Sequence, residues 1–477
     1  MLFRFSNILW IAVPSMLLLC IFLCVFSVAE ARQPNIVLIF ADDLGWKDVG
    51  YQGTDFYETP NIDRLARSGM VFTHAYATGG NCVPSRACLM SGLYTPRHEA
   101  YAVQSTNRGP KAKMRVVPVP DKPYLENRFV SVAAALKANG YTTGIFGKWH
   151  LEDSRIRGTS PKDHGFDVVF HGGGGPPPNS GGKGVFEDPK SVNTLTREAC
   201  TFIEANRDKP FFVFLSHYAI HTPHQTTQAT LDKFKNKTPG KQHNDPHYAG
   251  VLYDMDKSVQ VLLDKIDALG LADNTVVVLT SDNGGIQQSS QEPLRGSKGC
   301  YYEGGIREPF IVRWTGVVKP GSVSDVPTVN LDLYPTFLDI AQGKVPEGVT
   351  LDGESLVPIL KGTGSLQRQS VFWHFPGYLD VPVNRGRDND FRTRPTSVIR
   401  KGDWKLHLFH EEWVLDGGRA KIDTNNCVEL YNTKDDIGER INLATTNKQK
   451  RDELLDDLLA WFKETQAKLP TPLPSTN

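Results

Sequence analysis

The strongest constraint on the fold comes from four continuous apolar runs, each as long as a buried β-strand and each ending abruptly in polar residues. An uninterrupted apolar run is typical of a strand in a parallel sheet that helices cover on both faces. Helical periodicity lies between the runs, at residues 130–138 and 253–269. This alternation predicts an α/β fold with a wound central sheet flanked by helices. The four runs are residues 35–41, 142–147, 211–215 and 275–280.

Polar and ionisable side chains follow each of these runs. The carboxyl ends of neighbouring parallel strands meet at one edge of a sheet, and ligand sites of wound α/β folds lie at that edge. If the four strands are neighbours, their polar ends form one crevice. These residues are Asp42 and Asp43 after the first run, Lys148 and His150 after the second, His217 and His221 after the third, and Asp282 and Asn283 after the fourth.

The ends of the first and fourth runs suit a hard metal ion. Asp42, Asp43, Asp282 and Asn283 offer the carboxylate and amide oxygens that calcium and magnesium prefer. An Asp-Asp pair after a strand is also typical of a solvated loop or a helix cap. The sequence Asp-Asn-Gly-Gly at 282–285 favours the metal site.

Basic residues that lie near these carboxylates would cancel their charge. If Arg86, Lys148 and Lys298 lie there, they offset three carboxylates and leave no excess of positive charge for an anionic ligand. A bound divalent ion would make the site net positive and would lower the pKa of an oxygen nucleophile bound to it.

The pattern changes near residue 370. Shorter alternating segments at 396–400 and 404–409 are followed by an amphipathic run around Leu454 and Leu458. We predict a catalytic domain over 34–370 and a smaller C-terminal domain over 371–470, made of an antiparallel sheet and a helix. The chain has 53 basic and 53 acidic residues among 477, so its net charge gives no reason to expect nucleic-acid binding.

Residues 1–31 predict an export signal. A basic start and a long apolar stretch lead to Ala29-Glu30-Ala31, a small-x-small cleavage pattern. We expect cleavage after Ala31 and a periplasmic or secreted protein. The alternative is a retained leader that anchors the protein in a membrane. A glycine- and proline-rich run at 172–182 lacks the phosphate-loop pattern and predicts a loop at the rim of the site.

Five cysteines follow the leader, an odd number for an oxidising compartment. If Cys82 is converted to another residue, the remaining four either form two disulfides, in one of three pairings, or stay as buried thiols. These four are Cys88, Cys200, Cys300 and Cys427.

Three blocks of sequence carry a family resemblance. Cys82-Val83-Pro84-Ser85-Arg86 resembles the maturation signature of type I, formylglycine-dependent sulfatases, members of the alkaline phosphatase superfamily. The run at 140–150, which ends in Gly-Lys-Trp-His, resembles the second signature of that family. The block at 294–309 resembles the later block that contributes a sulfate-binding lysine. The resemblance spans residues 34 to about 443 and implies an alkaline-phosphatase-like fold.

This resemblance implies a mechanism and its cofactors. A formylglycine-generating or anaerobic sulfatase-maturing enzyme oxidises the signature cysteine to formylglycine, and one hydroxyl of the hydrated aldehyde attacks the sulfur of a sulfate ester. The second hydroxyl then allows sulfate to be expelled. One calcium ion is implied. Its ligands would be the modified Cys82 together with Asp42, Asp43, Asp282 and Asn283.

The family roles transfer to matching positions in this chain. Cys82 supplies the nucleophile and Asp282 accepts its proton, while Arg86 and Lys148 hold the oxygens of the modified residue. His221 protonates the leaving alcohol, Lys298 stabilises the charge of the sulfate, and His150 is the base that triggers sulfate release. His217 and His224 are predicted to be hydrogen-bonded structural residues.

The implied substrates are sulfate esters of sugars in sulfated polysaccharides or glycosaminoglycans, with small aryl sulfates as surrogates. One alternative is a phosphate or phosphonate ester hydrolase that uses the same nucleophile. Another is a noncatalytic protein that binds sulfated glycans with Cys82 unmodified. A cluster of arginines is typical of a solvated loop or, alternatively, of a subsite for an anionic saccharide. It comprises Arg385, Arg387, Arg392 and Arg394.

Overall fold

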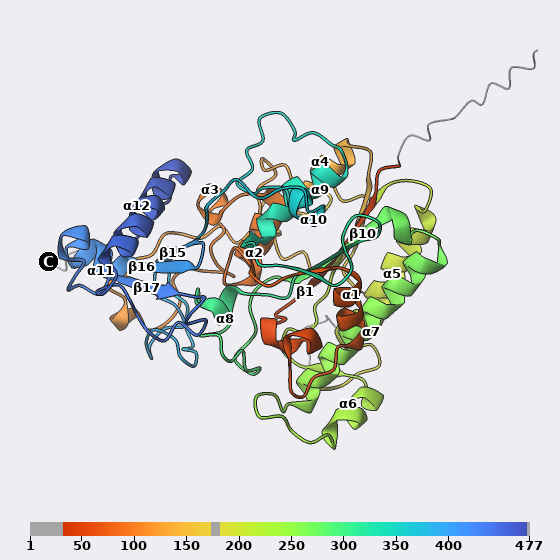
Figure 1. The fold of residues 1–477 in the computed structure, drawn as a ribbon, viewed down its shortest axis with the longest axis horizontal. Helices are drawn as coiled ribbons and strands as arrows, with labels where there is room; N and C mark the ends of the chain where they lie inside the picture. The colour runs from red at the N-terminus through yellow and green to blue at the C-terminus, as the bar shows by residue number, and fades with distance from the viewer. Residues whose placement is uncertain (1–31, 173–181, 475–477) are drawn as a thin grey trace, which may run out of the picture. The chain divides into compact units, whose positions relative to one another are not determined.

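The computed structural model describes residues 32–172 and 182–474 and contains an eight-stranded mixed sheet, whose strands β1 and β10 are labelled in Figure 1. Its order is β12-β2-β11-β10-β1-β8-β5-β6. The four apolar runs form its four consecutive parallel strands, which confirms the predicted wound α/β fold. They are β10 (Thr275–Ser281), β1 (Asn35–Ala41), β8 (Phe211–Ser216) and β5 (Thr142–Gly147). The outer strands are β12 (Ser322–Ser324), β2 (Met70–Phe72), β11 (Ile311–Trp314) and β6 (Val168–Phe170).

The register of these strands aligns their polar ends. Ala41 lies opposite Ser281, and Ser216 lies opposite both Phe40 and Gly147. The approach of β5 to β8 requires glycine, since a Cβ on Gly147 would lie 1.9 Å from the carbonyl oxygen of Ser216. The four polar ends therefore meet at one edge of the sheet, as the sequence predicted.

Two helical layers cover the sheet because side chains alternate along the strands. Ile36, Leu38 and Phe40 of β1 pack toward one layer, and Val37 and Ile39 pack toward the other. The first layer holds α2 (Cys82–Ser91), α4 (Val132–Ala138) and α9 (Leu333–Ile340). The second holds α1 (Pro60–Ser68), α5 (Val192–Ala205) and α7 (Pro246–Ala268), and Figure 1 shows α5 and α7 running together.

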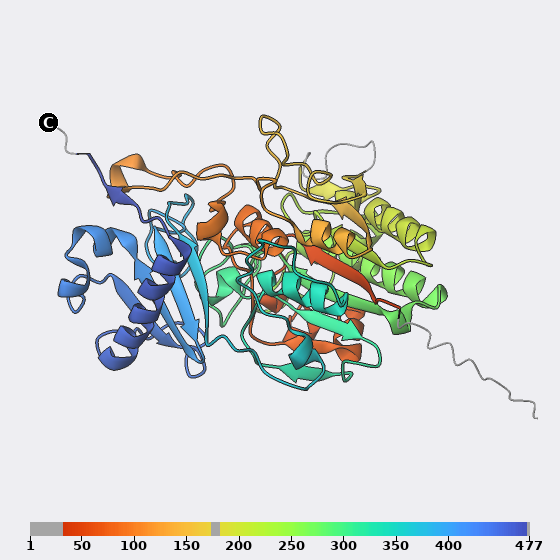
Figure 2. The same ribbon diagram turned by 90° about the horizontal axis from the view of Figure 1, so that it is seen from above.

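A separate four-stranded antiparallel sheet follows the central sheet in the chain, with α12 (Lys448–Thr465) packed on it (Figure 2). The predicted antiparallel sheet and helix are thereby confirmed, whereas the domain boundary near residue 370 stays a prediction. The strands are β14 (Ser370–Phe375), β15 (Thr396–Lys401), β16 (Trp404–Phe409) and β17 (Val428–Asn432).

Shorter elements connect these layers. Within the described residues, no helix is long and apolar enough to cross a membrane. The predicted leader and most of the predicted rim loop lie outside those residues. The short elements include α3 (Thr95–His98), α6 (Gln228–Lys235), α8 (Glu303–Ile306), α10 (Val357–Leu360), α11 (His410–Leu415), β3 (Ala75–Tyr76), β4 (Val116–Val117), β7 (Gly184–Val185), β9 (Gln225–Thr226), β13 (Thr328–Val329) and β18 (Thr471–Pro472).

Candidate active site

Three ion pairs lie at the carboxyl edge of the central sheet. Each joins a carboxylate that follows β1 or β10 to a basic residue from another segment, and together they bear no net charge. The three carboxylates and the three basic residues whose charges cancel in the sequence are therefore paired in the structure. The pairs are Arg86 Nη2 with Asp282 Oδ2 at 2.9 Å, Lys148 Nζ with Asp42 Oδ2 at 2.6 Å, and Lys298 Nζ with Asp43 Oδ1 at 2.5 Å.

Arg86 ties the strand ends together from within α2. Its guanidinium donates hydrogen bonds to Ser216 Oγ at 2.6 Å and to the carbonyl oxygen of Lys148 at 3.0 Å, in addition to Asp282. The guanidinium also lies 5.1 Å from the ring centroid of Phe40. Ser216, to which we assigned no role from the sequence, thus holds Arg86 in place.

Cys82 is the first residue of α2 and is 1% exposed. Its Sγ lies 3.5 Å from Asp42 Oδ1 and 3.4 Å from Lys298 Nζ. Burial first, and the negative charge of Asp282 second, raise the pKa of the thiol to about 12. Cysteines that act as thiolates have a lowered pKa instead. The unmodified side chain is therefore a poor nucleophile in this setting.

The residues around Cys82 fit a hard cation. Asp42, Asp43, Cys82 and Asp282 each offer one ligand atom, and these atoms lie within 4.8 Å of one another. Asn283 donates its amide N–H to Asp43 Oδ1 at 3.0 Å, and its buried Oδ1 has no hydrogen-bond partner among the described residues. A buried amide oxygen without a partner is costly, and a cation would satisfy it. The oxygen-rich donor set matches calcium.

Two of the ion pairs hold their charges although they are largely buried. Burial alone would raise the pKa of Asp282, but Arg86 and Lys148 hold it well below its ordinary value. Burial alone would lower the pKa of Lys298, but Asp43 and Cys82 raise it overall. Asp42 differs, because burial raises the pKa of its carboxyl group in spite of Lys148. Charges held in place before the substrate binds are a property of preorganised catalytic centres.

A cavity of about 520 Å³ opens beside the ion pairs. His221 Nε2 lies 3.8 Å from Asp43 Oδ2, and its Nδ1 lies 2.6 Å from the carbonyl oxygen of Thr222. Although the His150 side chain reaches solvent, desolvation by the surrounding protein and then the charge of Lys148 lower its pKa, so the ring is neutral. The cavity is lined by Val103, Lys148, Trp149, His150, Glu152, His171, Tyr218 and His221.

The remaining histidines near this edge have structural partners. His217 is buried with its Nε2 3.1 Å from Ser258 Oγ, and His224 is buried with its ring edge against Tyr248. The sequence offered no signal for Lys190, a buried lysine on a short turn whose pKa falls to about 8, first through desolvation, while Asp42 and Asp43 act in the opposite sense. Glu152, His171 and Tyr218 were also missed as lining residues because only tertiary packing brings them to the cavity.

The arginine cluster separates into two kinds of residue. Three of its members are occupied by carboxylates: Arg385 by Glu292 at 3.1 Å, Arg387 by Glu412 at 2.9 Å, and Arg394 by Asp388 at 2.5 Å and Glu411 at 2.9 Å. In the part of the chain that the structure describes, Arg392 forms no ion pair and donates only to backbone carbonyl oxygens.

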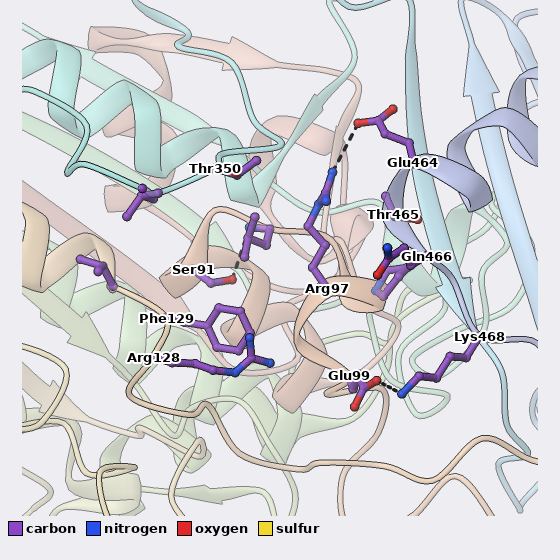
Figure 3. Close-up of a pocket in the computed structure, with 15 residues that line it drawn as sticks. Ser91, Arg97, Glu99, Arg128, Phe129, Thr350, Glu464, Thr465, Gln466 and Lys468 are labelled. Atoms are coloured by element: carbon purple, nitrogen blue, oxygen red, sulfur yellow. Dashed lines mark hydrogen bonds and ion pairs between the residues drawn. The ribbon is translucent and has the colours of Figure 1, made fainter.

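A second cavity, of about 720 Å³, lies between α3 and the C-terminal end of α12 (Figure 3). Four of its charged residues pair with one another: Arg97 with Glu464 at 3.3 Å, and Lys468 with Glu99. Arg128 pairs with Glu126, which does not line the cavity. None of the described residues that line it belongs to the predicted site. The cavity beside the three ion pairs is therefore the candidate active site.

The fold and the site together define a wound α/β protein with paired charges at the carboxyl ends of its central strands and a buried cysteine at a helix N-terminus. A sulfatase family model matches residues 34–343, and a model described as N-sulphoglucosamine sulphohydrolase, C-terminal, matches residues 297–468. The chain belongs to the sulfatase family, and its activity is sulfate ester hydrolysis.

Curated relatives and solved structures agree with this assignment. A sulfatase of Formosa agariphila is 31% identical, over 94% of this chain and 91% of its own length. Arylsulfatase A of Homo sapiens is 31% identical, over 87% of this chain and 84% of its own length. The crystal structure of Ps i-CgsB in complex with k-i-k-neocarrahexaose is 27% identical, with a TM-score of 0.71 over 93% of this chain and 96% of that chain.

Proposed function

We propose that this protein is an exported, calcium-dependent sulfatase that removes sulfate from sulfated saccharides, with formylglycine made from Cys82 as its nucleophile. The observation that carries the proposal is the state of Cys82. It lies at the centre of a preorganised charge cluster, yet burial keeps its thiol protonated and inert. Conversion of Cys82 to an oxygen nucleophile would explain why a cysteine lies at this position.

Calcium would be held by Asp42, Asp43, Asp282, Asn283 and the modified Cys82. Asn283 Oδ1 supports this assignment because it is buried and has no partner among the described residues. When bound, the ion and the hydrated aldehyde would supply positive charge, an activated hydroxyl for attack on sulfur, and a second hydroxyl for sulfate release. The three ion pairs are neutral by themselves, so the added charge is what would favour an anionic ester.

The chain's own residues orient the reaction. Lys298 lies 3.4 Å from Cys82 Sγ and is held charged, so it is placed to bind the oxygens of the sulfate. His221 faces the cavity and is placed to protonate the leaving alcohol. His150 lines the same cavity and is our candidate for the base that triggers sulfate release, a role that its position supports and its lowered pKa does not. The role of Asp282 as the first proton acceptor stays a prediction.

A saccharide substrate is supported by the named ligand of one solved relative, a neocarrahexaose bound to Ps i-CgsB. The cavity of about 520 Å³ is large enough for one sugar ring and is lined by hydrogen-bonding side chains such as Tyr218 and His171. Export rests on the predicted leader, and the predicted mature chain begins at Arg32. N-terminal sequencing of protein recovered outside the cytoplasm tests that start.

The mass of the tryptic peptide 68–86 tests the proposal. Protein co-expressed with a sulfatase-maturing enzyme should show a loss of about 18 Da at Cys82, the change from cysteine to the aldehyde. Release of sulfate from nitrophenyl sulfate should appear only in the modified fraction. An unmodified thiol despite an active maturase, with glycan binding retained, would support the noncatalytic alternative. Faster cleavage of a matched phosphate ester would support the phosphatase alternative.

A further inference from the structure

Arg392 differs from every other member of the arginine cluster in having no counter-ion. Its Nε donates to the carbonyl oxygen of Val381 at 3.2 Å, and its Nη1 donates to the carbonyl oxygen of Lys298 at 3.3 Å. Its second terminal nitrogen has no partner among the described residues. Burial lowers the pKa of this half-buried arginine, and Arg108 acts in the same sense. A guanidinium desolvated without a carboxylate retains the capacity to bind an anion.

The backbone at Lys298 and Gly299 fixes the position of Arg392. A Cβ on Gly299 would lie 2.2 Å from Arg392 Cδ, so the stem of the arginine covers that glycine. Gly299 in turn donates its N–H to the carbonyl oxygen of Gly80 at 2.7 Å, two residues before the nucleophile. Arg392 thus lies against the segment of Lys298 and Gly299, which is hydrogen-bonded to the residues just before α2. It is close to the three ion pairs of the site but is not part of them.

The charge that a second anionic group would meet differs between the cavity and the Lys298 segment. Glu152, two residues after His150, is exposed and lines the cavity beside His150 and His221. Arg392 is positively charged and donates to the carbonyl oxygen of Lys298. A second negative group on a substrate would be repelled at Glu152 and attracted at Arg392.

We propose that Arg392 forms a subsite for a second sulfate of the saccharide whose ester sulfate is bound at Lys298. The planar fork of arginine matches two oxygens of a sulfate, and Arg392 has donors available for them. This inference rests on the proposed function and narrows its substrate class to saccharides with more than one sulfate.

The test measures binding separately from turnover. Calorimetry with the full chain carrying Cys82→Ala compares two carrageenan tetrasaccharides, one with a single sulfate per disaccharide and one with two. We expect the doubly sulfated sugar to bind about tenfold more tightly, the contribution of a charge-assisted hydrogen-bonded pair. Adding Arg392→Met should abolish that preference, and Arg392→Lys should retain part of it because the charge remains without the fork.

Lys113→Met is the matched control. Like Arg392→Met, it removes one positive charge near the segment that contains Asp390, but Lys113 is an exposed side chain. It should leave the ratio of the two dissociation constants within about twofold, because exposed charges are screened. Equal affinity for the two sugars, or the same loss of preference in Lys113→Met as in Arg392→Met, would overturn the subsite. Failure of the proposed function would appear separately, as absence of sulfate release by the matured wild-type protein.

Discussion

Two of the buried charge clusters among the described residues differ in hydrogen bonding, because one of them contains a buried oxygen without a partner. The active-site cluster consists of the three ion pairs around Cys82. The junction cluster links α8 to the C-terminal sheet: Lys405 Nζ lies 3.0 Å from both Glu303 Oε1 and Glu439 Oε1, and Arg307 Nη1 lies 3.2 Å from Glu303 Oε2. The second oxygen of Glu439 accepts the backbone N–H of Glu303 at 2.6 Å. Both clusters are almost fully excluded from solvent.

The difference between the clusters lies in their hydrogen bonding rather than in their burial. Every carboxylate oxygen of the junction cluster has a partner, whereas Asn283 Oδ1 in the active-site cluster has none among the described residues. A buried ionic network that is fully satisfied holds segments together, while an unsatisfied one is arranged for a ligand. We therefore expect substitutions in the active-site cluster to affect chemistry and those in the junction cluster to affect stability.

The largest expected effect is the loss of activity in Cys82→Ala. Without the nucleophile, turnover of nitrophenyl sulfate should fall by a factor on the order of 10⁴ or more, which corresponds to about 5.5 kcal/mol. Cys200→Ala, which removes a buried thiol from α5, is the matched control and should keep its activity. Comparable rates in the two variants would contradict the assignment of Cys82.

Lys405→Met should have the largest effect on stability. Lys405 lies between the carboxylates of Glu303 and Glu439 in the folded protein. Its removal leaves buried carboxylate charge uncompensated, which lowers the free energy of unfolding by about 3–5 kcal/mol. Urea denaturation measures this change. Lys401→Met is the control, because Lys401 forms partly exposed pairs with Glu453 and Asp457 and should contribute about 1 kcal/mol or less. If the two variants are equally stable, the junction cluster does not have its assigned role.

Removal of calcium should also distinguish the two clusters, through a smaller change in the free energy of unfolding than that expected for Lys405→Met. At a free calcium concentration 100 times the dissociation constant, bound ion stabilises the fold by about 2.7 kcal/mol. Chelation should therefore lower the unfolding midpoint of the wild type. Asn283→Ala should show a much weaker response to chelation, whereas Lys405→Met should respond as the wild type does. An identical response in Asn283→Ala would exclude this residue as a ligand.

The smallest predicted effect is a dependence of stability on pH at the junction. Burial first, and the charge of Lys405 second, hold the pKa of His407 well below its ordinary value. Below pH 6.5 the unfolded chain binds a proton that the folded one does not, so stability is lost as pH falls. His407→Gln should reduce the stability difference between pH 7.5 and pH 5.5 by about 1.4 kcal/mol. Denaturation at both pH values measures it, and an unchanged difference would count against this account.

Much of the fold followed from local pattern. The runs at 35–41 and 142–147 coincide with β1 and β5, and the segment at 404–409 coincides with β16. The expected helix at 253–269 overlaps α7, which begins earlier, at Pro246, and ends at Ala268. The pattern missed its first two turns because the boundary depends on Asp245, whose side chain accepts the N–H groups of His247 and Tyr248.

The ion-pair partners of the arginine cluster could not be predicted from the sequence. Four arginines within ten residues gave no basis for choosing among them. Three meet carboxylates that lie between 6 and 93 positions away along the chain, and one does not. Spacing in the sequence carries no information about such partners. Glu292 lies in the loop that precedes Lys298, whereas the partners of Arg387 and Arg394 lie within the C-terminal segment.

By itself, the sequence determined the wound α/β class, the polar strand ends and the family, because strand-length apolar runs and short signature blocks are local properties. Only the tertiary structure decided which charges pair, which oxygen and which guanidinium remain unsatisfied, and which side chains line the cavity. Those outcomes depend on the order and register of strands far apart in the chain. A continuous apolar run shows that a strand is buried on both faces, but it does not show which strand becomes its neighbour.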